Sequence, residues 1–256
     1  MRNLTNFNQG WSFIKNSGQI PTKVEENYEA VNLPHSWNSI DGQDGGNDYF
    51  RGTCYYVKNF KLSDLPANAK HYLEINGAAS SADVYVNGKL AASVDNMFMI
   101  HTVDISRLIA MGENEIFIHI KPVVVEAMKY EYPFMVSAGI NAYEQLYVRK
   151  PAHMFGWDIT PRYVSAGLYR PVSLVYTDGA EGIEEYYLCT ASATREKAVF
   201  EFYYKTNCLP ADNMTLKLEG DCGDSHFEED ILFNYPIGRR KIVFHNPKLW
   251  WPRNFG

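Results

Sequence analysis

The 256 residues suffice for one large domain or two of ordinary size, and 46% of them are hydrophobic, so the chain can fold around a substantial core. The formal net charge is −6 without any block of like charges, which disfavours nucleic acid and anionic membranes as partners. No run of about 18 apolar residues occurs, so we expect no transmembrane helix. Because the start of the chain shows no apolar signal region, a cytoplasmic protein and a secreted one that has lost its signal both remain open.

The first two thirds of the chain show patterns typical of β-strands. Asn87-Gly88 lies between two alternating runs of residues 82–94, which predicts a β-hairpin. Residues 106–114 predict one short helical turn, closed by Gly112. The other predicted strands cover residues 50–60, 71–77, 98–105, 114–122 and 172–176. Short strands at this spacing predict an all-β fold in the form of an antiparallel sandwich.

A domain boundary is predicted near TDGAEG, residues 177–182, where glycine and aspartate interrupt the strand pattern. We therefore expect a first domain over 1–179 and a second over 180–256. The second domain shows five strand patterns, whereas an immunoglobulin-like sandwich has about seven. Its end, KLWWPRNFG, is an aromatic turn that should lead into a further strand. We therefore expect a truncated immunoglobulin-like domain and a chain that is part of a longer protein. The five patterns cover residues 183–191, 197–206, 214–219, 230–235 and 241–245.

A loop rich in Asp, Asn and Gly, DGQDGGND, covers residues 41–48. Its carboxylates and amides are suitable partners for ligand hydroxyls, which both donate and accept hydrogen bonds. The same side chains can instead cap their own turns in a solvated loop. Calcium is a third reading, but the spacing differs from that of an EF-hand. No CxxC pair and no glycine-rich nucleotide motif occur either, so we expect no metal and no cofactor.

Trp157 and Asp158 adjoin each other within the long irregular segment KPAHMFGWDITPRYVSAGLYRPV. An indole offers a flat apolar plate for the C–H face of a pyranose, and an adjacent carboxylate can bind hydroxyls at the ring edge. The alternative is a buried tryptophan whose neighbour Asp158 pairs with Arg162 or Arg149. We expect Arg162 and Arg170 to hold this loop to the sandwich. His35, after Pro34, is expected to fix a turn.

The sequence does not single out catalytic residues. Retaining glycoside hydrolysis needs two carboxyl groups about 5–5.5 Å apart, and no spacing distinguishes such a pair among the 30 acidic residues. The GxSxG motif of serine hydrolases does not occur. Binding of a sugar is therefore better supported than catalysis.

Taken together, three segments resemble the amino-terminal part of glycoside hydrolase family 2, the group of β-galactosidases, β-mannosidases and β-glucuronidases. LPHSWNSIDGQDGGNDYFRGTCYYVKNF and FGWDITPRYVSAGLYRPVSLVY match its first sandwich, and NPKLWWPRNFG matches the end of its immunoglobulin-like domain. The resemblance covers nearly all 256 residues. It implies a jelly-roll, galactose-binding-like sandwich followed by the immunoglobulin-like one, with a catalytic TIM barrel after Gly256 of the same protein.

The resemblance implies a supporting role, without catalytic residues in this stretch. Asn47 and Asp48 are the expected sugar contacts of the 41–48 loop, and Trp157-Asp158 is similar to the Trp-Asp pair of β-mannosidases. Ile159 departs from that pattern, in which a second aromatic residue follows. GQDGGND is closer to β-galactosidases. We therefore expect a β-galactosidase before a β-mannosidase or β-glucuronidase, acting on a terminal β-linked hexose.

Two other classes remain open at this stage. One is a stand-alone carbohydrate-binding module without hydrolase activity, which would bind sugar by itself. The other is a structural sandwich that mediates contacts in a homo-oligomer. For part of a glycosidase we expect weak or no binding of the terminal sugar by this stretch alone, because the barrel would supply the other half of that site.

Overall fold

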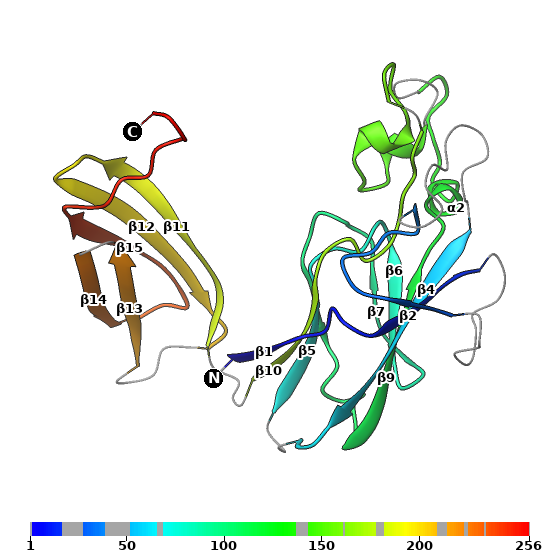
Figure 1. The fold of residues 1–256 in the computed structure, drawn as a ribbon, viewed down its shortest axis with the longest axis horizontal. Coiled ribbons are helices and arrows are strands. Elements are labelled where there is room, and N and C mark those ends of the chain that lie inside the picture. Colours follow the sequence, from blue (N-terminus) through cyan, green and yellow to red (C-terminus); the bar gives the residue numbers. More distant parts are fainter. Residues whose placement is uncertain are drawn as a thin grey trace. The chain divides into compact units, whose positions relative to one another are not determined.

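The structure, a computed structural model, describes residues 2–16, 28–38, 52–65, 69–136, 143–160, 162–177, 182–208, 214–222, 225–232 and 234–255. The chain divides into two compact units, Arg2–Asp178 and Gly179–Gly256 (Figure 1). Antiparallel sheets dominate both, which confirms the predicted all-β class. The limits and the functional names given to the two predicted domains stay predictions.

The first unit contains two antiparallel sheets (Figure 1). The four-stranded sheet has the order β1 (Arg2–Asn6), β10 (Val172–Thr177), β5 (Lys70–Ile75) and β8 (His101–Asp104). The six-stranded sheet has the order β3 (Glu29–Val31), β2 (Trp11–Asn16), β4 (Thr53–Leu62), β9 (Gly112–Ile120), β6 (Ala82–Val86) and β7 (Lys89–Val94).

Side chains from both sheets form one hydrophobic core, which makes this unit a β-sandwich. Ile116, Ile118 and Ile120 of β9 are fully buried, as the two-residue period of a strand requires. Leu73 and Ile75 of β5 contribute from the other sheet. Each such side chain contributes roughly 1.5–3 kcal/mol through removal from water.

The predicted hairpin is confirmed. Asn87 and Gly88 have φ angles of 49° and 76°, which the favoured two-residue turn demands, and they join β6 to β7. The helical turn predicted over 106–114 is wrong in its extent. The backbone amides of Leu108 and Ile109 donate to the carbonyl of Ile105, but Gly112 opens β9 and does not close a helix.

A long connection between β9 and β10 carries three short helical segments of this unit. They are α2 (Val123–Ala127) and the 3-10 turns η2 (Tyr143–Leu146) and η3 (Ala152–Phe155), none of which the sequence predicted. Val123, Phe155 and Val164 form a small buried cluster that joins α2 to η3 and to the segment that follows it. The connection is therefore packed locally. Among the described helices, none is long and apolar enough to cross a bilayer.

The second unit pairs a three-stranded sheet of β11 (Ile183–Ala193), β12 (Lys197–Thr206) and β15 (Ile237–His245) with a two-stranded sheet of β13 (Thr215–Cys222) and β14 (Ser225–Leu232). The strand predicted over 230–235 is misplaced, because β14 already begins at Ser225. The buried core consists of Ala198, Phe202, Tyr204, Leu216, Ile231, Ile242 and Phe244. β11, by contrast, is exposed along its whole length.

Candidate functional site

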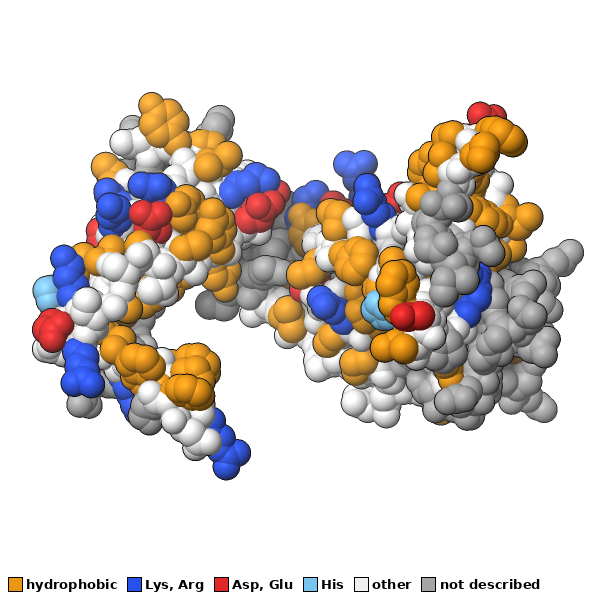
Figure 2. All heavy atoms as spheres, turned by 90° about the horizontal axis from the view of Figure 1, so that it is seen from above, with side chains coloured by type: hydrophobic (Ala, Val, Ile, Leu, Met, Phe, Trp, Pro, Cys, Tyr) orange, Lys and Arg blue, Asp and Glu red, His pale blue; other side chains and the backbone are white. Residues whose placement is uncertain are grey.

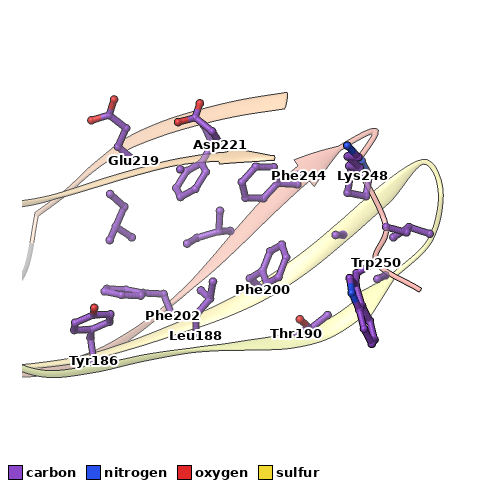
Figure 3. A pocket seen from close by; sticks show the side chains of 18 residues that line it. Tyr186, Leu188, Thr190, Phe200, Phe202, Glu219, Asp221, Phe244, Lys248 and Trp250 are labelled. Carbon is purple, nitrogen blue, oxygen red and sulfur yellow. The ribbon is translucent and has the colours of Figure 1, made fainter. Parts of the chain in front are cut away.

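An apolar groove of about 580 Å³ lies between the two sheets of the second unit (Figure 3). Leu188, Phe200 and Phe202 line it from β11 and β12. Glu219 and Asp221 of β13 also border it, but Figure 3 shows their carboxylates on the side away from these rings. A sugar needs several converging hydrogen-bonding groups, so this groove suits apolar side chains better than a saccharide.

The first unit brings together the two segments that carry the resemblance, although they are more than a hundred residues apart. The backbone amide of His35 donates to the carbonyl of Leu168 at 2.9 Å, and that of Trp37 to Ala166 at 3.0 Å. The hydroxyls of Ser36 and Ser165 lie 2.5 Å apart. We call this pairing of residues 35–37 with 165–168 the seam.

Gly167 lets the two sides of the seam approach closely. Its φ of +145° disfavours other residues, and an added Cβ would lie 2.6 Å from the carbonyl oxygen of His35 and 2.7 Å from the hydroxyl of Tyr56. The Tyr56 hydroxyl also lies 2.8 Å from Nδ1 of His35. Burial and then the charge of Lys15 lower the pKa of His35, so its ring is neutral near pH 7. The His35 side chain therefore packs in the seam against Tyr56, and its expected role in fixing a turn stays a prediction.

Lys150 fastens the start of the Trp-Asp loop to the seam. This side chain is only 5% exposed, and its ammonium donates to the carbonyl of Ser165. Burial lowers the pKa of Lys150 to about 8. No local pattern indicates this contact, because a lysine before a proline resembles any solvated loop residue.

An ion pair holds the other end of the loop. Arg162 donates to Glu144 of η2 at 2.7 Å and to the carbonyl of Phe155 at 3.3 Å. The Glu144 side chain is 6% exposed, so this pair is shielded from solvent screening. Arg162 thus holds the loop to η2 of the same connection, whose glutamate the sequence did not single out. That it also holds the loop to the sandwich stays a prediction. Arg170 instead lies over the ring of Tyr169, with 5.5 Å from its guanidinium carbon to the ring centroid.

Trp157 and Asp158 lie on a tight turn between these two anchors. The backbone amide of Trp157 donates to the carbonyl of Thr160 at 2.9 Å, and the amide of Thr160 donates to the carbonyl of Trp157 at 3.2 Å. Gly156 precedes the turn with a φ of +105°, a conformation that favours glycine. The local hydrogen bonds fix the path of the backbone here, so both side chains are presented from a defined position.

Both side chains of the pair are available to a ligand in this structure. Trp157 is 58% exposed and Asp158 is exposed as well. One oxygen of Asp158 accepts a bond from the backbone amide of Ile159 at 2.9 Å. Its carboxylate forms no ion pair with any other described residue, so the alternative of a buried tryptophan beside an arginine-bound aspartate is not what the structure shows.

The other predicted contacts, Asn47 and Asp48, lie outside the described residues, as does the rest of the 41–48 loop. Whether this loop meets the Trp157 turn therefore stays a prediction. Within the described ranges, no three His, Cys, Asp or Glu side chains gather closely enough to hold a metal ion.

Comparison with known proteins identifies the family. Residues 20–170 match the family model described as the glycosyl hydrolase 2 galactose-binding domain-like domain, so the chain belongs to that family. The predicted resemblance to glycoside hydrolase family 2 is thereby confirmed.

Curated relatives agree with this assignment, and a solved structure shares the fold. A β-glucuronidase of Formosa agariphila is 29% identical over 45% of this chain and 13% of its own length. β-Mannosidase B of Emericella nidulans is 26% identical over 78% of this chain and 24% of its own length. The crystal structure of a β-D-mannosidase from Dictyoglomus thermophilum, 19% identical, superimposes with a TM-score of 0.73 over 99% of this chain and 33% of that one. The chain thus spans a quarter or less of the length of these two curated relatives.

Proposed function

We propose that this chain is the amino-terminal, non-catalytic part of a retaining exo-glycosidase. In this proposal the first unit helps to shape the subsite for a terminal β-linked hexose, and a TIM barrel of the same protein carries both catalytic carboxylates. The observation that carries the proposal is the exposed Trp157-Asp158 pair on a turn anchored at both ends. Family membership supports the reaction class.

The chemical role of the turn follows from its side chains. The indole of Trp157 would support the apolar face of the terminal sugar, while the free oxygen of Asp158 would accept hydrogen bonds from its hydroxyls. Asn47 and Asp48 would add further contacts. Such groups act on the rate by positioning, since misplacement by about 1 Å can reduce a rate on the order of 100-fold.

The sugar itself is proposed from the sequence alone. The GQDGGND loop favours a β-galactoside, whereas the relatives described above are named for glucuronides and mannosides. β-Galactosidase remains our first proposal, and the other two activities are the alternatives to be measured beside it.

Hydrolysis assays test this proposal. The complete protein and the 256-residue chain are each incubated with the p-nitrophenyl β-glycosides of galactose, mannose and glucuronic acid. We expect the complete protein to release p-nitrophenol from one of them and the chain alone to release none. Absence of hydrolysis by the complete protein, together with tight sugar binding by the chain, would instead identify a carbohydrate-binding module.

A further inference from the structure

A second, polar cleft of about 390 Å³ lies in the first unit, and Trp157 and Asp158 take no part in it. It lies where the start of β6, the end of β7 and the residue after β9 meet the segments around α2 and η2. Its volume falls within the range of small-ligand sites. The lining residues are Ser80, Ser81, Ser93, Val94, Asp95, Lys121, Glu126, Tyr130, Tyr147, Val148 and Arg149.

Two stacked tyrosines form an aromatic wall of this cleft. The ring centroids of Tyr130 and Tyr147 lie 5.2 Å apart, and the angle between the two ring planes is 15°. Tyr132 contacts Tyr147 edge-on, with 5.0 Å between the ring centroids. Tyr130 and Tyr147 are each nearly half exposed. The contacts restrain the rings, so they offer a fixed apolar plate with hydroxyl groups at its edge.

A buried serine also borders the cleft. Ser80 is 2% exposed, and its Oγ forms no hydrogen bond with any described residue. Because less than 1 Å² of this oxygen is exposed, Ser80 adds polarity to the wall of the cleft, and the contacts to a ligand come from its more exposed residues.

The charged groups of the cleft are balanced. Lys121 is held by Asp83 at 2.7 Å, and Asp83 also accepts a bond from Ser93 at 2.5 Å. Asp95 and Arg149 are exposed and form no side-chain hydrogen bond or ion pair with another described residue. One free acid and one free base favour a neutral ligand with several hydroxyls over a phosphate or a cation.

We propose that this cleft binds one pyranose unit of an oligosaccharide, as a second saccharide site separate from the Trp157 turn. The tyrosine wall would contact the C–H face of the ring, and Asp95 and Arg149 would bind its hydroxyls. The inference does not depend on the proposed terminal-sugar subsite, because no residue of the Trp157 turn lines the cleft, nor on a catalytic barrel, because every group it uses lies in the first unit.

Nuclear magnetic resonance titration of the ¹⁵N-labelled 256-residue chain tests the site, with lactose, β-1,4-mannobiose and cellobiose as probes. We expect saturable shifts of amides around the cleft with at least one disaccharide. Tyr130→Ala and Arg149→Met should each weaken that binding about tenfold, the equivalent of one good hydrogen bond or contact. Arg149 is exposed, so its variant tests the site even if Tyr130→Ala disturbs the fold.

Matched controls separate this inference from the proposed function. Tyr187 is exposed and also stacks on a tyrosine, with its ring centroid 4.5 Å from that of Tyr203 in the second unit, so Tyr187→Ala should leave binding unchanged. Asp158→Ala should leave it unchanged as well. Binding lost in Asp158→Ala but kept in Arg149→Met would overturn the second site while supporting the Trp157 turn. Absence of saturable shifts with all three sugars, or the same shifts with inorganic phosphate, would overturn it too.

Discussion

The two units of the chain bury their hydrophobic residues to very different degrees. In the first unit, strands of a four-stranded and a six-stranded sheet enclose a core that includes Trp11, Leu73 and Ile118, each at most 1% exposed. In the second unit, β11 is exposed throughout, and the apolar groove leaves residues such as Leu188 in contact with water. A sandwich that encloses its core keeps more of the stabilisation that apolar burial provides.

The difference extends to the polar chemistry. The first unit carries the anchored Trp157 turn and the polar cleft, both supported by packed segments around the sandwich. Hydrophobic side chains reach the surface on both units (Figure 2), but in the second unit they line a groove between sheets. Binding groups are generally positioned by a rigid scaffold, so the first unit is the better place for sugar recognition.

Truncation of a leucine in each unit gives the largest expected contrast. Leu73→Ala removes a fully buried side chain and should lower the free energy of unfolding of the first unit by about 2–5 kcal/mol. Leu188 is 54% exposed, so Leu188→Ala should cost the second unit less than about 1 kcal/mol. Urea unfolding, with each unit followed by hydrogen exchange of its own strands, measures both. Equal losses would show that the groove is closed in solution.

The seam provides a second test of how tightly the first unit is packed. Gly167→Ala should destabilise it by about 3 kcal/mol, because the new methyl group meets the backbone of His35 and the φ angle is unfavourable. Gly88→Ala is the matched control, since it also has a positive φ but nothing within 4 Å of the added carbon. We expect Gly88→Ala to lower the free energy of unfolding by about 1 kcal/mol. Similar melting temperatures for the two variants would contradict close contact at the seam.

The buried Lys150 gives the first unit a distinct pH dependence. Its pKa is about 8 when folded and about 10.4 in an unfolded chain, so between these values the unfolded state binds more protons. Stability should therefore rise as pH increases from 8 to 10.5, by on the order of 3 kcal/mol at most. Lys150→Met should remove this rise. Thermal melts of both proteins across that range measure it, and parallel curves would contradict burial of the charge.

Local patterns predicted much of this structure. The Asn87-Gly88 turn and the alternation of Ile116, Ile118 and Ile120 determined a hairpin and a buried strand, because each depends on residues close in sequence. The strands β1, β2 and β3 were missed. Their short runs mix polar and apolar residues, and their pairing with distant strands decides their conformation.

Parts of the candidate site could not be predicted from the sequence. The Glu144–Arg162 ion pair and the contact of Lys150 with Ser165 depend on how the β9–β10 connection packs, and no local motif encodes that packing. The polar cleft likewise joins Ser80 to Arg149 across 69 positions of the chain. Trp157-Asp158, in contrast, could be singled out from the sequence, because a carboxylate directly after an indole is a pattern of two adjacent residues.

Kinetics of the complete protein carrying single changes on the Trp157 turn tests the central claim most directly. Asp158→Ala should lower kcat/KM on the order of 100-fold without changing the circular dichroism spectrum or melting temperature. Ile159→Ala, a change at the adjacent and 88% exposed position, should leave kcat/KM unaltered. If both variants hydrolyse the substrate as fast as the parent protein, the Trp157 turn does not contact the terminal sugar.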